Sequence, residues 1–84
     1  MLDLYLTVRS VTPGQKGSEA LSRAGIRNRL LRAPRAIAPG GCAYALTVSA
    51  AHGTRALAVL DRAGVSVSGV WRRDPEGAFA HAAL

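Results

Sequence analysis

The chain contains one cysteine, Cys42, and its thiol is the side chain best suited to nucleophilic chemistry. It follows the turn-forming run Pro39-Gly40-Gly41 and precedes an apolar stretch that begins at Ala43. A glycine loop that runs into a strand exposes a side chain, and a nearby cation favours the thiolate, so the pattern predicts a reactive thiol with Arg35 as its cation. The alternative is a small buried core residue, because free cysteine is among the most buried residue types.

Three further residues belong to the predicted site. The backbone N–H groups of Gly40 and Gly41 can form an anion-binding nest, and the fixed charge of Arg35 can bind an anionic substrate or lower the pKa of the thiol. Arg35 can equally hold the loop by donating hydrogen bonds to backbone carbonyls. The chain has no second cysteine, so an atom accepted by Cys42 must leave to another molecule. This favours a carrier or accessory protein over a complete enzyme.

Other candidate chemistry is weaker. A zinc site would need Cys42, His52, His81 and a fourth ligand, and no ligand spacing supports it, so we expect neither a metal nor a cofactor. The run from Pro13 to Ser18 has some likeness to a phosphate-binding loop, but its spacing does not match the GxxxxGK[ST] motif. We interpret this run as the start of a helix.

Periodicity predicts the elements that position these residues. Residues 1–9, 26–31, 44–48 and 65–71 alternate as strands. Thr12 and Pro13 begin a first helix that ends at Gly25, with a first turn weakened by its glycines. Ser49 caps a second helix that ends at Gly64. Its core stripe consists of Ala56, Leu57, Leu60 and Ala63.

The two halves of the chain repeat. The run Leu21-Ser22-Arg23-Ala24-Gly25-Ile26 is echoed by Leu60-Asp61-Arg62-Ala63-Gly64-Val65. A βαβ unit written twice predicts the α+β class and a ferredoxin-like βαββαβ sandwich, with two helices on one face of a four-stranded antiparallel sheet. Residues 1–71 form this domain, and residues 72–84 are a C-terminal tail, either loose or one short helix. Cys42 then lies on the loop that joins the second and third strands.

The outer face of such a sheet supports an alternative function. Arg27, Arg29 and Tyr5 would lie there and give a binding module for a protein or, weakly, for RNA. RNA-binding sheets stack bases on two or three aromatics, and this face offers one, so nucleic acid is not the expected partner. Trp71, at the end of the fourth strand, is interpreted as a packing residue.

Composition and charge limit the partners and the cellular location that the chain can have. The 84 residues have a formal net charge of +6, carried by ten arginines and one lysine against five acids. This charge would suit an anionic partner, but a solvated basic surface explains it as well, and it says nothing of fold. Asp3 stands where a signal peptide would have a base, and the apolar start is too short to span a membrane. With a single thiol, these features predict a cytoplasmic protein without a membrane partner.

The loop also resembles a known family. Pro34-Arg35, Ile37, Gly41-Cys42 and the glycine–aliphatic pair Gly25-Ile26 follow the pattern of the small selenium/sulfur carrier-like domains, over roughly residues 2–71. The resemblance implies that Cys42 carries a persulfide or selenopersulfide between donor and acceptor proteins. Apart from the resemblance, large apolar residues are few, so dimerisation could add stability, and a second copy of the chain is a further candidate partner. The family usually has glycine after the cysteine, whereas this chain has Ala43, which restricts the backbone there.

Overall fold

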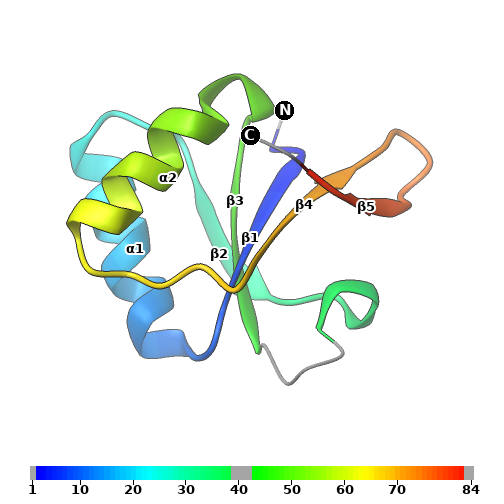
Figure 1. Cartoon of the computed structure of the whole chain (residues 1–84), viewed down its shortest axis with the longest axis horizontal. Coiled ribbons are helices and arrows are strands. Elements are labelled where there is room, and N and C mark those ends of the chain that lie inside the picture. Colours follow the sequence, from blue (N-terminus) through cyan, green and yellow to red (C-terminus); the bar gives the residue numbers. More distant parts are fainter. Residues whose placement is uncertain (1, 39–42, 83–84) are drawn as a thin grey trace.

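A computed structural model describes residues 2–38 and 43–82 (Figure 1). In chain order the elements are β1 (Leu4–Val8), α1 (Val11–Arg23), β2 (Arg29–Arg32), the 3₁₀ turn η1 (Arg35–Ile37), β3 (Tyr44–Val48), the 3₁₀ turn η2 (Ala50–His52), α2 (Gly53–Arg62), β4 (Gly69–Arg73) and β5 (Phe79–His81). The α+β class, with two helices and an antiparallel sheet, is confirmed. β3 has the predicted bounds, whereas β2 and β4 begin three to four residues later than predicted.

The described residues form a sheet of five strands in the order β2-β3-β1-β4-β5, so the predicted count of four is wrong. All neighbouring strands pair antiparallel, and the central register places Leu6 of β1 between Leu46 of β3 and Val70 of β4. The two edges are β2 and β5. The loop that carries Cys42 joins edge strand β2 to the inner strand β3, as predicted.

The extra strand comes from residues 72–84, which were predicted to be a loose tail or one short helix. A turn reverses the chain after β4: the carboxylate of Asp74 accepts hydrogen bonds from the N–H groups of Glu76 and Ala78, both at 2.9 Å. Gly77 adopts φ 91°, a conformation that glycine reaches at little cost. The predicted domain boundary at residue 71 falls inside β4.

Both helices pack against one face of the sheet (Figure 1). Leu21 of α1, Leu60 of α2 and Leu46 of β3 are all fully buried in this core. The predicted stripe on α2 is confirmed, because Ala56 and Leu60 are fully buried and Leu57 and Ala63 pack against the same cluster.

The two helices end in the same way, as the internal repeat indicated. Gly25 and Gly64 have φ of 75° and 76°. The N–H of Ile26 donates to the carbonyl of Leu21, and the N–H of Val65 donates to that of Leu60, each at 2.9 Å. This six-to-one bond, with a buried apolar contact across it, is the Schellman motif.

The first helix begins earlier than predicted and is more tightly packed. It starts at Val11, with Ser10 rather than Thr12 at the N-cap and no side-chain capping bond. Its glycines, expected to weaken the first turn, are buried. A Cβ on Gly17 would lie 2.7 Å from Cδ1 of Leu46 and 2.9 Å from Cδ2 of Leu60, so this glycine lets α1 lie close to both the sheet and α2.

The second face of the sheet is not open to solvent near its centre. Every residue of β1 is buried, including those that point away from the helices. A smaller core forms there from Tyr5, Ala45 and Ile37, with Phe79 packed against it. Figure 1 shows why: η1 and the β4–β5 hairpin both lie on the side of the sheet opposite the helices.

Candidate functional site

The candidate site is the loop between β2 and β3, and the structure fixes its two ends. The N–H of Ala33 donates to the carbonyl of Ala43 at 2.9 Å, which extends the β2–β3 ladder by one pair. Ala43, the residue after the cysteine, is thereby held at the base of the loop. Cys42, Gly40 and Gly41 lie outside the described residues.

Arg35 is the predicted site residue that the structure describes. It is the first residue of η1, preceded by Pro34 in an extended conformation, φ −57° and ψ 148°. The turn is closed by hydrogen bonds from Ile37 N–H to the Pro34 carbonyl at 3.0 Å and from Ala38 N–H to the Arg35 carbonyl at 3.3 Å. The Arg35 side chain is exposed and has no acidic partner within 4 Å among the described residues.

A side chain that the sequence reasoning did not single out holds this loop to the sheet. Ile37 is 2% exposed and packs with Tyr5 and Ala45 on the second face. η1 is therefore fastened by one apolar side chain three to five residues before Gly40, Gly41 and Cys42. The sequence feature that marks this residue is the pattern Pro-Arg-x-Ile, which the family resemblance contains.

A second cation stands at the foot of the loop. Arg32 ends β2 opposite Tyr44 of β3, and its guanidinium carbon lies 5.9 Å from the centre of the Tyr44 ring. Such a contact orients an arginine over an aromatic face. Arg32 and Arg35 thus give the loop two exposed positive charges on its β2 side.

The two histidines lie in separate elements. His52 is exposed in η2 and does not cap α2 with its side chain. His81 lies on β5, where its ring stacks on Trp71 with centroids 3.8 Å apart, and this contact gives Trp71 a packing partner. Among residues 2–38 and 43–82, no group of three His, Cys, Asp or Glu side chains could hold a metal ion.

The aromatic residue of the alternative RNA site, Tyr5, is buried. Tyr5 is only 8% exposed, and its ring packs edge-on against Phe79 at a centroid distance of 5.0 Å. A base cannot stack on a ring that is covered in this way. The expectation that Tyr5 faces solvent is therefore wrong, whereas Arg27 and Arg29 are exposed as expected.

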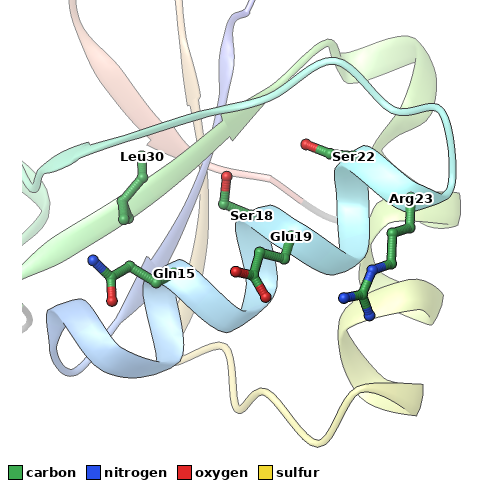
Figure 2. Close-up of a pocket in the computed structure, with 6 residues that line it drawn as sticks. All are labelled: Gln15, Ser18, Glu19, Ser22, Arg23 and Leu30. Atoms are coloured by element: carbon green, nitrogen blue, oxygen red, sulfur yellow. The ribbon is translucent and has the colours of Figure 1, made fainter.

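A groove lies between α1 and β2 (Figure 2). Leu30 of β2 points toward the helix across it, and the remaining lining residues are Gln15, Ser18, Glu19, Ser22 and Arg23 of α1. Asn28 ties the helix to the strand: its Oδ1 accepts from the Ser18 hydroxyl at 2.6 Å, and its Nδ2 donates to the Ser22 hydroxyl at 3.1 Å. The run from Pro13 to Ser18 lies within α1, so it forms helix rather than a phosphate loop.

The chain matches a known protein family over most of its length. Residues 3–72 match the model of the family described as "Putative Se/S carrier protein-like". No curated protein and no solved structure matches the chain significantly. Within the described part of the chain, neither helix has the length and apolar character needed to cross a lipid bilayer.

Proposed function

Because the chain belongs to the "Putative Se/S carrier protein-like" family, we propose that Cys42 accepts a sulfur or selenium atom from a donor protein and delivers it to an acceptor. The family match over residues 3–72, which includes the only cysteine of the chain, is the observation that carries this proposal. A reducing cytoplasm suits it, since free thiols persist there.

The transfer needs no external oxidant. The Cys42 thiolate attacks the terminal sulfur of a donor persulfide, and a new S–S bond forms on Cys42. The donor's own S–S bond breaks, and its electron pair stays on the donor thiolate. Delivery repeats the step: an acceptor thiolate attacks the terminal sulfur, and the Cys42 thiolate leaves. Terminal selenium in place of sulfur follows the same balance.

The surroundings of the loop support a thiol that works with partners. Arg32 and Arg35 are exposed on its β2 side, and positive charge near a sulfur favours the thiolate. The Ala33–Ala43 hydrogen bond and buried Ile37 hold the segments on either side of residues 39–42. We assign Gly40 and Gly41 the role of amide donors to the anionic sulfur or selenium.

Intact mass tests the proposal directly. After incubation with a cysteine desulfurase and either cysteine or selenocysteine, wild-type protein is expected to gain one sulfur or selenium atom that a thiol reductant removes. Cys42→Ser is expected to gain nothing. A wild type that stays unmodified, or a Cys42→Ser variant that gains the same mass, contradicts the proposal.

The pH profile of alkylation tests the part assigned to Arg35. We expect the pKa of the Cys42 thiol, read from iodoacetamide labelling, to lie below the ordinary value of about 8.5. Arg35→Gln removes a cation that stabilises the thiolate, so the profile moves to higher pH, by roughly half a unit for a solvent-exposed charge. Arg62→Gln, on α2, serves as the control and should leave the profile in place. Overlapping profiles for Arg35→Gln and wild type would assign Arg35 to holding the loop instead.

A further inference from the structure

The edge of the sheet beside the candidate site carries an unusual concentration of positive charge. Residues 27–35 contain four arginines and no acid, although the whole chain has only eleven basic residues. All four, Arg27, Arg29, Arg32 and Arg35, are exposed. The only ion pair among the described residues joins Arg72 to Asp3, so none of these four arginines is ion-paired with an acid of the described chain.

The same edge has backbone groups that face away from the sheet. Among the described residues, β2 has a single neighbour in the sheet, β3. The bond from Ala33 N–H to the Ala43 carbonyl marks a hydrogen-bonded pair, and such pairs alternate along an antiparallel ladder. Leu31 and Arg29 are then the next hydrogen-bonded positions, paired with Ala45 and Thr47. The N–H and carbonyl groups of Leu30 and Arg32 consequently point outward, where another strand can pair with them.

From these observations we infer that an acidic, extended segment of a partner protein adds to the sheet along β2, next to the Cys42 loop. Its backbone pairs with Leu30 and Arg32. Its carboxylates meet Arg32 when they lie on the face of the sheet that carries the helices, and Arg29 when they lie on the other face. This inference rests on the proposed function in one respect: the proposed function identifies the partner protein as the donor or the acceptor of the sulfur or selenium atom. A strand docked here would bring its protein to the base of the loop, where Ala33 pairs with Ala43.

The groove of Figure 2 gives the added strand room. It lies between β2 and α1, with a volume of about 680 Å³, and hydroxyl and amide groups from Ser18, Ser22 and Gln15 line it. Alternate side chains of the added strand would point toward this groove, as they do on any strand. The charges of Glu19 and Arg23 at its wall offset each other, so the arginines of β2 set the sign of the surface.

Charge also argues against a second copy of this chain as the strand that adds to β2. In an antiparallel pairing of β2 with a second copy of itself, the arginines of both strands would come together, and like charges across a strand pair are destabilising. A basic edge therefore repels its own copy and attracts an acidic strand. Single-stranded RNA would satisfy the charge but not the outward N–H and carbonyl groups, and Tyr5 is buried.

The test uses labelled full-length protein and the peptide (Glu-Val)₅, with amide hydrogen exchange read by NMR at each residue. At saturation we expect exchange at the Leu30 and Arg32 amides to slow by at least about tenfold, while the inward-facing amide of Leu31 changes less. Binding should weaken as salt is raised. Unchanged exchange at Leu30 and Arg32 overturns the inference.

Charge variants give the second arm. Arg29→Glu/Arg32→Glu is expected to lower the affinity for (Glu-Val)₅ by at least about tenfold, and Arg62→Glu by less than about twofold. If circular dichroism shows that Arg29→Glu/Arg32→Glu does not fold normally, the variant Arg27→Glu/Arg35→Glu is measured instead. Both of its substitutions lie outside β2, and its affinity for the peptide is also expected to fall by at least about tenfold. Equal binding of (Lys-Val)₅, or equal protection of the two amides by a uridine oligomer, overturns the inference.

A final comparison separates this inference from the proposed function. Cys42→Ser should bind (Glu-Val)₅ as wild type does, because the strand edge does not include the thiol. A protein that accepts the sulfur or selenium atom but does not bind the peptide contradicts this inference alone. A protein that binds the peptide but never gains the atom contradicts the proposed function alone.

Discussion

Replacing Ile37 with alanine is expected to lower the free energy of unfolding by about 2–4 kcal/mol, since it removes three methylene-sized groups from a fully packed position. Ile37 is 2% exposed and is the only residue of η1 that is buried. Its neighbours on the second face, Tyr5 and Ala45, belong to the inner strands β1 and β3, so they have little freedom to close the cavity. The cost should therefore lie well above that of an ordinary surface substitution.

Chemical denaturation of Ile37→Ala and Val11→Ala measures this difference. Val11 is 39% exposed in the first turn of α1, and its truncation should change stability by less than about 0.5 kcal/mol. A loss for Ile37→Ala no larger than that of Val11→Ala would show that η1 does not depend on the sheet for its position. In that case the loop would have no apolar attachment at residue 37.

The helix-bearing face could be predicted because its residues recur at regular intervals. Leu4, Leu6 and Val8 alternate, and Ala56 and Leu60 repeat at helical spacing, so their burial follows from the period alone. The helix ends followed from glycine, which readily adopts the positive φ that the Schellman motif needs. The loop position of Cys42 followed from the order of these elements.

The second face could not be predicted in this way. Ile37 lies between two prolines, and Phe79 lies in a stretch of mostly small and polar residues, so neither belongs to a periodic pattern. Each is an isolated apolar side chain whose burial depends on tertiary packing against Tyr5. The expectation that Tyr5 is exposed was therefore wrong, and with it the assignment of the one aromatic residue to the alternative RNA surface.

The site was predicted by residue type more than by geometry. Cys42 and Arg35 stood out because a thiol and a guanidinium have chemistry of their own. The pairing of Ala33 with Ala43 and the outward groups of Leu30 and Arg32 depend on strand register, and a one-residue shift in register would reverse which groups face out. Sequence alone did not fix the start of β2, so it could not assign the free edge.

Substitutions at Gly17 and Leu46 are expected to have strongly non-additive effects on stability, because a side chain at residue 17 would contact the Leu46 side chain directly. Leu46→Ala should lower the free energy of unfolding by about 3–5 kcal/mol, because a fully buried leucine leaves a cavity between α1 and the sheet. Gly17→Ala should cost about 1–2 kcal/mol: its methyl would lie 2.7 Å from Cδ1 of Leu46, and the gain in helix propensity offsets only part of the strain.

The double variant is the informative protein, because the new methyl of residue 17 enters the space that the leucine leaves. Its loss of stability should be smaller than the sum of the two single losses by about 1 kcal/mol or more. Gln15→Ala, exposed on the same helix, replaces Gly17→Ala in a control cycle and should add to Leu46→Ala within about 0.5 kcal/mol. If the Gly17 and Leu46 losses also add, the glycine does not set the distance between α1 and the sheet, and its place in the helix has no packing reason.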